Sequence, residues 1–513
     1  MNLLNTLPIF RNLHSPHGGS AARLRLAVLS AAFLGLAAMT LIVGVLFSPP
    51  KKALARIPVQ PSAHIEMAAT PSKPDTAQIT ITLCAPVTAL DFGLLLTGPD
   101  GATGLRQRQW VLAGDDHQFV RRASRLYAVR KDGKPFTRLR FEAPATPLFI
   151  TGDYQPAFAM TAQDGSPVLG LYTGHFWPYD APGRRMPVSF SLSQDESTQT
   201  QTLAPIWPVN NHEALSDHPA FVFFGAGGVH RLPRHDVLVH AALADWVKAE
   251  AEPLIDEALT VLADGFGVPL GERPLIVLAK AGSPGDRAQP SAPHAVGGLF
   301  RFAGDALPRQ VLTVIDGSPW DTPSATGRSI LRRALVHELV HLWQARIRPQ
   351  SPDVPAWIHE GAAEAITAEV LVRMGLWEQS AAEAFHRKAA ADCDEGARYK
   401  RVDTLTKAAA FRTVYACGHM LARLAAMPRP GTPSSTTPVM DFWRAFLDES
   451  KGPDARYSLE SWLAFTAVRS GNQPRATAIR QFLTRKWPLP AARLEQIGEI
   501  EPGGSYAAGP AGQ

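Results

Sequence analysis

Two short motifs, HELVH and WIHEGAAEA, lie close together in the second half of this 513-residue chain. The first begins at His337 and places two histidines four residues apart, which is about one turn of an α-helix. The second begins at Trp357, after a loop that contains three prolines. The sequence therefore predicts two helices, at about 329–344 and 355–373, that turn back on each other and bring their polar side chains together.

The spacing of these polar residues suits a metal site. His337 and His341 would leave one helix face together and could each bind a zinc ion at about 2.0–2.1 Å. Glu360 follows His341 after 18 residues, and the returning helix would bring it to the histidines as a third ligand. Glu338, about 100° around the helix, could take a proton from water at the metal without being a ligand. Glu364, one turn after Glu360, is predicted to bond the second nitrogen of a ligand histidine. An HExxH pattern also occurs in helices without metal, but its combination with Glu360 predicts one Zn²⁺ per chain.

This combination resembles the gluzincin metallopeptidases, as in the aminopeptidase N family, in which HExxH is followed after 18 residues by a glutamate within WxxEGxxE. The stretch LWQARIRP after His341 is also similar to the sequence that follows the zinc helix in the glycyl aminopeptidase family. The resemblance implies a thermolysin-like α+β catalytic domain, with a β domain before it and helices after it. It also implies His337, His341 and Glu360 as zinc ligands, and Glu338 as general base and acid in peptide hydrolysis.

Two further features of these families have partial counterparts here. Tyr415, in TVYACGHML, resembles a tyrosine that stabilises the oxyanion, although a tyrosine of the core would fit the same pattern. The families also carry a glutamate in a glycine-rich edge strand, where it binds the substrate's free amine. Gly297 and Gly298 fit that strand and could pair with a peptide backbone, but Phe300 stands where the acid is expected. The sequence thus predicts a peptidase with doubtful aminopeptidase specificity, and Asp305 is the candidate to replace the missing acid.

The N-terminal part contains a membrane-length apolar run, Leu26 to Phe47, with no charged residue and three arginines ahead of it. A run of this length crosses a hydrocarbon core of about 30 Å as a helix. The preceding arginines favour a cytoplasmic segment 1–25 and a periplasmic remainder, anchored by a single pass in the inner membrane. The alternative is a secreted enzyme released by cleavage near Ala55.

The remaining chain divides by composition and periodicity. A segment rich in proline, alanine and lysine predicts a linker, and the short alternating runs after it predict antiparallel strands. Beyond them, helical periodicity surrounds two buried strands. The expected parts are a linker at 48–76, an antiparallel β-sandwich-like domain at 77–205, the zinc peptidase domain at 206–425, a helical region at 426–500 and a disordered tail at 501–513.

Four local expectations each follow from one or two residues. The Asp132-Gly133 pair predicts a β-hairpin, and Pro253 is expected to break or kink its helix. His359 is expected to be a surface or loop histidine. Cys393 and Cys417 could form a disulfide in an oxidising compartment, a pairing that the sequence leaves open.

Composition narrows the class of function. The net charge of +5 is small and is spread along the chain, which argues against a nucleic-acid partner. The three cysteines contain no CxxC pair, so neither a cysteine zinc site nor a redox motif is expected. The sequence favours a membrane-anchored zinc peptidase that acts on peptides or proteins. The alternative is a binding or scaffold protein of the cell envelope that keeps the metal site. The presence of Glu338 argues against this alternative, because a purely structural zinc site would not need that carboxylate.

Overall fold

The computed structural model describes residues 62–500 apart from 71, 97–105, 107–108, 151–153, 182–183, 195–203, 208–217, 226, 283–299, 350–353, 429–430, 432–434 and 451–454. The predicted span Leu26–Phe47, the segment 1–25, the tail 501–513, and both Gly297 and Gly298 lie outside the described residues. Within the described ranges, no helix is long and apolar enough to cross a membrane.

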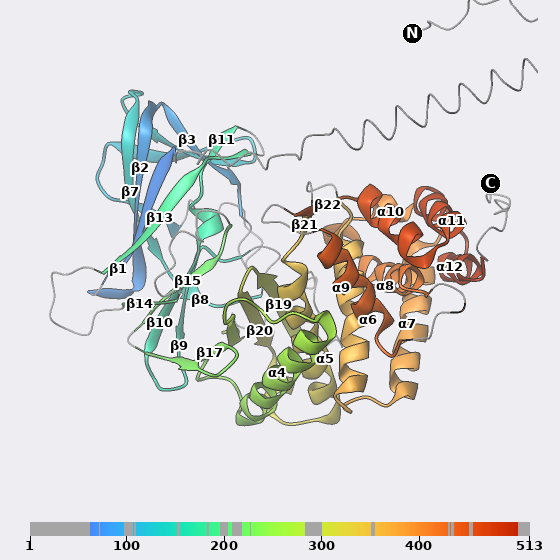
Figure 1. Cartoon of the computed structure of the whole chain (residues 1–513). Coiled ribbons are helices and arrows are strands. Elements are labelled where there is room, and N and C mark those ends of the chain that lie inside the picture. Colours follow the sequence, from blue (N-terminus) through green and yellow to red (C-terminus); the bar gives the residue numbers. More distant parts are fainter. Residues whose placement is uncertain are drawn as a thin grey trace, which may run out of the picture. The chain divides into compact units, whose positions relative to one another are not determined.

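The first part of the described chain consists of three five-stranded sheets (Figure 1). Their strand orders are β13-β1-β2-β7-β4, β12-β11-β3-β6-β5 and β14-β15-β10-β9-β8, and most neighbours are antiparallel. Burial alternates along β2, where Ile79, Ile81 and Leu83 face the core, because successive side chains of a strand point to opposite faces. The strands are β1 (Ala63–Thr70), β2 (Lys73–Val87), β3 (Ala89–Leu94), β4 (Val111–Leu112), β5 (His117–Arg122), β6 (Arg125–Arg130), β7 (Phe136–Pro144), β8 (Thr146–Pro147), β9 (Ala157–Thr161), β10 (Pro167–Tyr172), β11 (Tyr179–Ala181), β12 (Arg184–Arg185), β13 (Val188–Gln194), β14 (Ala204–Trp207) and β15 (Phe221–Gly225).

The expected linker at 48–76 is wrong at its C-terminal end, because β1 and the start of β2 lie within it. β1 pairs with β2 on one side and with β13 on the other. Ile65 and Met67 are fully buried in this central strand. The alternation of β1 is carried partly by alanines and the strand is bounded by prolines, so the composition of the whole segment conceals it.

The Asp132-Gly133 pair makes a turn but not the predicted hairpin. β6 before the turn pairs with β3 and β5, whereas β7 after it pairs with β2 and β4 of another sheet. Gly133 has φ +73°, and the Asp132 carboxylate accepts hydrogen bonds from the Arg130 side chain at 2.9 Å. The turn chemistry thus fixes a local change of direction, while the sheet that the next strand joins is decided by packing elsewhere.

A mixed sheet with order β16-β17-β18-β20-β19 begins the second part of the chain. β17, β18 and β20 run parallel, and the antiparallel β19 forms one edge. β18 and β20 are buried almost throughout, as expected for strands covered on both faces. These strands are β16 (Val229–Arg231), β17 (Asp236–Val239), β18 (Leu275–Lys280), β19 (Arg301–Leu307) and β20 (Gln310–Asp316).

Helices make up most of the rest of the chain, together with a small two-stranded sheet (Figure 1). Among them, α5 packs on both α4 and α6, and α6 packs on α8. The elements are α4 (Asp245–Phe266), α5 (Ala325–Gln344), β21 (Arg348–Pro349), α6 (Trp357–Arg373), α7 (Gln379–Ala397), α8 (Lys407–Ala425), α9 (Pro438–Glu449), β22 (Arg456–Tyr457), α10 (Leu459–Ser470), α11 (Gln473–Thr484) and α12 (Pro490–Gly498).

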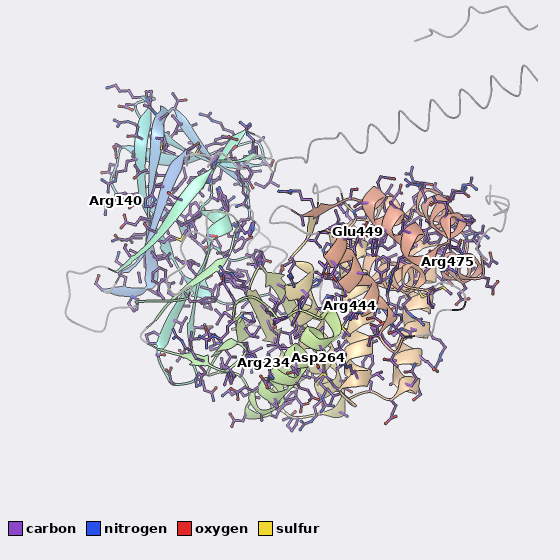
Figure 2. The ribbon with its side chains drawn as sticks, viewed as in Figure 1. Arg140, Arg234, Asp264, Arg444, Glu449 and Arg475 are labelled. Atoms are coloured by element: carbon purple, nitrogen blue, oxygen red, sulfur yellow. A yellow bond between two sulfur atoms is a disulfide. The ribbon has the colours of Figure 1, made fainter. Side chains whose placement is uncertain are left out.

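The helix expected to break or kink at Pro253 continues through it as α4. Proline removes one backbone donor and therefore leaves the carbonyl of Ala249 without its helical partner. Both residues are exposed, so water can satisfy that carbonyl. The buried face of α4, which includes Ile255 and Leu259, is not interrupted. At the far end of α4, Arg444 of α9 contacts the Gly265 carbonyl at 3.5 Å. Figure 2 labels Arg444 and Asp264, the residue before Gly265.

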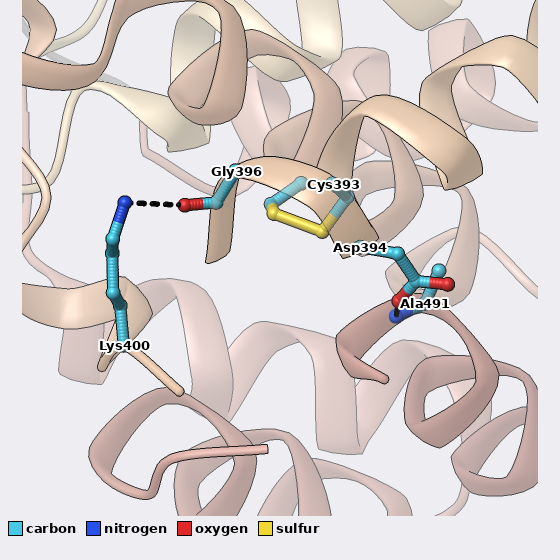
Figure 3. Close-up of a disulfide and its surroundings, with 6 residues drawn as sticks. Cys393, Asp394, Gly396, Lys400 and Ala491 are labelled. Atoms are coloured by element: carbon cyan, nitrogen blue, oxygen red, sulfur yellow. Dashed lines mark hydrogen bonds between the residues drawn. A yellow bond between two sulfur atoms is a disulfide. The ribbon is translucent and has the colours of Figure 1, made fainter. Parts of the chain in front are cut away.

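A disulfide joins α7 to α8. The Cα atoms of Cys393 and Cys417 are 4.8 Å apart, and both residues are fully buried. Figure 3 shows the bond beside Asp394, whose carboxylate accepts from the Ala491 amide at 2.6 Å at the start of α12. The pairing that the sequence left open is therefore present, and it ties the helix that carries Tyr415 to its neighbour.

Candidate active site

Three side chains from α5 and α6 converge on one point, as the sequence predicts. Nε2 of His337 and Nε2 of His341 are 3.1 Å apart, and each lies 3.4 Å from Oε2 of Glu360. His337 and Glu360 are about 5% exposed, so the donor atoms face one another inside the protein rather than solvent. Among the described residues, this is the one group of three or more metal-binding side chains whose ligand atoms all lie within 4.8 Å.

The local sequence explains why these side chains are held so closely. Ser324 caps the start of α5 by accepting a hydrogen bond from the Gly327 amide at 2.9 Å, and the middle turns of α5 are buried on nearly every side. α6 returns against α5 and packs even more tightly on α8. A Cβ on Gly361 would lie 2.0 Å from the backbone of Gly418, so the glycine pair lets the two helices approach each other. Glu360 therefore lies on a helix that is closely packed against its neighbours.

Each of the two histidines has a polar neighbour at its second ring nitrogen. Nδ1 of His337 lies 3.4 Å from Oε1 of Glu364, which places Glu364 where the sequence predicts it, although the geometry is not that of a hydrogen bond. Nδ1 of His341 contacts Oε1 of Gln344 at 2.6 Å, and the Gln344 amide donates to the carbonyl of His359 at 3.1 Å. Sequence reasoning missed Gln344. Its spacing of three residues from His341 on the same helix is the signal that could have identified it.

Glu338 lies beside the converging group and is buried. Burial raises the pKa of its carboxyl to about 7, while His337 and His341 act to lower it. A cation held by the neighbouring donors would lower this pKa further, since an opposite charge favours the carboxylate. A Cβ on Gly304 of β19 would lie 2.3 Å from Oε1 of Glu338. Glycine at this position therefore lets the edge strand pass directly over the carboxyl.

Tyr415 of α8 reaches the same place. Its ring stacks on the His337 ring at 5.5 Å, and its hydroxyl is hydrogen-bonded to Glu360. Burial, followed by the negative charges of Glu360 and Glu338, raises the pKa of the phenol well above its ordinary value. The hydroxyl therefore keeps its proton and can act as a donor at the site.

His359 is not the surface or loop residue that the sequence suggested. It lies within α6, its side chain is 29% exposed, and its ring centroid is 5.9 Å from that of His341. Its Nδ1 lies 3.1 Å from the hydroxyl of Tyr457, a residue almost 100 positions later in the chain. As the residue directly before Glu360 in α6, His359 lies at the edge of the site. Tyr457 is too distant in the sequence for this contact to be inferred from local patterns.

The edge strand β19 supplies a different acid from the one expected by resemblance. Phe300 is half-buried, with its ring 5.0 Å from that of Trp320, and it packs against the core. Asp305 lies five residues later and bonds to the hydroxyl of Tyr154, from the first part of the chain. Burial and the charge of Asp305 raise the pKa of Tyr154 well above its ordinary value, so this phenol also stays protonated.

Two cavities meet at this strand. One, of about 340 Å³, is lined by Glu338, His341, Glu360, His359 and Tyr415. A second, also of about 340 Å³, is lined mainly by apolar and aromatic side chains of the first part of the chain, including Phe158 and Phe221. Tyr172, Gly304 and Asp305 line both cavities. A ligand lying along β19 could therefore occupy the polar cavity and extend past Asp305 into the apolar one.

No known protein family and no curated protein match this sequence. Solved structures do match its fold. An aminopeptidase N family protein from Idiomarina loihiensis superposes with a TM-score of 0.56 at 9% identity, over 85% of this chain and 78% of that one. An M1 zinc metallopeptidase from Deinococcus radiodurans matches at 14% identity with a TM-score of 0.44, over 86% of this chain and 95% of the other. The first comparison shows that this chain has a fold like that of an aminopeptidase N family protein, which agrees with the multidomain arrangement of β domain, α+β domain and helices.

Proposed function

We propose that this protein is a zinc-dependent peptidase of the gluzincin type. The observation that carries the proposal is the convergence of His337, His341 and Glu360 beside the buried carboxyl of Glu338. Two imidazoles and one carboxylate are a usual protein ligand set for catalytic zinc, in which the fourth position stays open. A purely structural site would be closed by a fourth protein ligand and would have no use for Glu338.

The donor set fits zinc by its chemistry. Nitrogen donors paired with one carboxylate suit Zn²⁺, whereas magnesium and calcium prefer oxygen ligands. The partners at Nδ1 of each histidine, Glu364 and Gln344, are of the kind that fix a ligand's ring orientation. A zinc ion bound there would supply Lewis-acid polarisation of the scissile carbonyl and make a nearby water more acidic.

The chain's own residues would carry the proton and charge chemistry. Glu338 takes a proton from the attacking water and later delivers it to the leaving amine, and its burial favours accepting that proton. Tyr415 donates a hydrogen bond to the developing oxyanion after its hydroxyl leaves Glu360. The edge of β19 pairs with the backbone of an extended peptide, which places the scissile bond over Glu338.

We further propose that Asp305 binds the free amine of the substrate. The carboxylate lies where the two cavities meet, one strand position beyond Gly304 and its contact with Glu338. Its bond to Tyr154 fixes its orientation. Asp305 would thus replace the glutamate whose expected place is taken by Phe300, and the enzyme would prefer unblocked N-termini.

The proposed location is outside the cytoplasm, with residues 26–47 as the membrane anchor. A disulfide such as Cys393–Cys417 is typical of proteins in oxidising compartments and supports this location. The anchor itself rests on the length of the apolar run and on the arginines before it.

The first test compares the wild-type protein with Glu338→Gln and His337→Ala. We expect one zinc per chain in the wild type and in Glu338→Gln, but not in His337→Ala. Hydrolysis of a peptide library should fall by roughly 10²-fold or more in Glu338→Gln, because the general base is lost. Equal inertness of wild type and Glu338→Gln, with zinc bound to both, would favour the scaffold alternative. Stoichiometric zinc in His337→Ala would refute the ligand assignment.

A further inference from the structure

We propose that His359 is a positioning residue for the metal ligand Glu360, and that Tyr457 holds His359 in this role. The inference rests on the zinc site proposed above. It concerns how tightly that site binds its metal, and it gives the C-terminal helical region a direct part in the site.

The two oxygens of Glu360 have different surroundings. Oε2 lies 3.4 Å from Nε2 of both His337 and His341, so it points toward the shared metal position. Oε1 faces Nε2 of His359 at 3.6 Å. This distance exceeds that of a hydrogen bond, so the contact is electrostatic. A donor at Oε1 leaves Oε2 as the oxygen available to the metal and thereby limits rotation of the carboxylate.

Tyr457 determines which nitrogen of His359 can donate. The Tyr457 hydroxyl lies 3.1 Å from Nδ1. Burial, followed by the charge of Glu360, raises the pKa of this phenol well above its ordinary value, so the hydroxyl keeps its proton. When the phenol donates to Nδ1, the proton of a neutral imidazole resides on Nε2, which is the nitrogen that faces Glu360. The bond from Tyr457 thus selects the tautomer that can hold the ligand.

The position of Tyr457 is fixed independently of His359. It lies in β22, which pairs with β21 so that Tyr457 is opposite Pro349. Its ring packs on Trp443 at 6.3 Å and on Phe446 at 6.1 Å, both in α9, and it is 2% exposed. The hydroxyl is therefore preorganised at Nδ1, and its loss should affect Glu360 through His359 rather than through a change in fold.

The test is the dissociation constant for zinc, measured on the full chain by competition with a chromophoric chelator. His359→Ala should weaken zinc binding by about 10- to 100-fold, the usual range for loss of an outer partner of a metal ligand. Tyr457→Phe should weaken it less. The double variant should be no weaker than His359→Ala alone, because Tyr457 acts through His359. His359→Gln, which keeps an N–H donor, should recover part of the affinity.

Two matched variants serve as controls. His64→Ala removes an exposed imidazole on β1, and Tyr399→Phe removes the hydroxyl of a tyrosine that is 61% exposed. Neither residue lies in the cavity that contains the zinc donors, so both variants should bind zinc as the wild type does. Melting of each metal-free variant reports its fold. If His359→Ala unfolds, the zinc dissociation constants of His359→Gln and Tyr457→Phe test the inference instead.

An unchanged zinc dissociation constant in folded His359 and Tyr457 variants would overturn the inference. If KM for peptides rose in those same variants, His359 would be a substrate contact instead. Zinc affinity is measured without peptide, so a wild-type chain that binds zinc but cleaves nothing would refute only the proposed activity. A wild-type chain that binds no zinc would refute the proposed metal site and this inference with it.

Discussion

At the scale of single residues, some side chains of the site could be predicted from the sequence and others could not. His337, His341 and Glu360 could be placed from helical spacing and one return of the chain. Gln344 could have been placed in the same way. Tyr457 comes from almost 100 residues after Glu360 and Tyr154 from more than 200 before it, so neither position follows from local periodicity.

Tyr415→Phe tests the proposed oxyanion donor. The substitution removes one hydroxyl and leaves the ring that stacks on His337. We expect kcat/KM to fall on the order of 10²-fold, because a donor aimed at developing charge is lost. Zinc content should be unchanged, since the phenol is not a proposed ligand. If kcat/KM of this variant equalled that of the wild type, Tyr415 would be a core tyrosine with no part in catalysis.

Asp305→Asn tests the proposed amine site. The wild type should cleave a peptide with a free N-terminus at least about 10-fold faster than its N-acetylated form, because a paired charge is lost on acetylation. Asp305→Asn should lose most of this preference through a higher KM for the free peptide. Asp321→Asn, at an aspartate paired with Lys280 at the surface, is the control. Equal cleavage of both peptides by the wild type would show a peptidase that does not select for the N-terminus.

At the scale of elements, the close approach of α6 and α8 positions both Glu360 and Tyr415. Gly361 and Gly418 allow the two backbones to meet, and the Cys393–Cys417 bond ties α8 to α7 one residue away from Gly418. α8 also contains a kink at Ala410, five residues before Tyr415, where the backbone leaves the helical region. The disulfide and the glycine contact thus fix the part of α8 that lies beyond the kink.

Gly361→Ala should therefore destabilise the protein, although alanine is the better helix former by about 1 kcal/mol. The new Cβ would lie 2.0 Å from the Gly418 backbone, and backbone cannot move away without shifting a helix. Overpacking of this kind costs about 1–3 kcal/mol, which outweighs the gain in propensity. Urea unfolding measures the change. Gly271→Ala, where a Cβ meets nothing within 4 Å, is the control. Equal stability of Gly361→Ala and wild type would contradict the tight contact.

The elements themselves were predictable to different degrees. α5 and α6 follow from periodicity, and β18 and β20 follow from apolar runs bounded by turn residues. β1 was missed because small residues carry half of its buried face. The partner strands of β6 and β7 could not be inferred, because a turn specifies a local change of direction and not the sheet that the next strand joins. The stretch AVGGLFRFAG, residues 295–304, was expected to be the edge strand, and its last four residues begin β19, the strand that lies over Glu338.

At the scale of the whole molecule, three distant segments contribute to one site. The first part of the chain gives Tyr154 and Tyr172, helices α5 and α6 give the proposed metal donors, and the C-terminal region gives Tyr457. An isolated segment 301–425 would therefore lack Tyr154, which bonds to Asp305, and Tyr457, which contacts His359. This dependence is a physical reason for the three parts to be joined in one chain.

Membrane topology is also a property of the whole molecule, and the apolar run Leu26–Phe47 predicts it. A reporter enzyme that is active only outside the cytoplasm, fused after Gln513, should be active and should sediment with membranes. The reason is that a charge-free run of this length favours the bilayer core, while the preceding arginines keep the N-terminus inside. A matched fusion that lacks residues 26–47 should be inactive. A released, active fusion whose N-terminus lies near Arg56 would show a cleaved signal instead of an anchor, and an inactive full-length fusion would place the peptidase site in the cytoplasm.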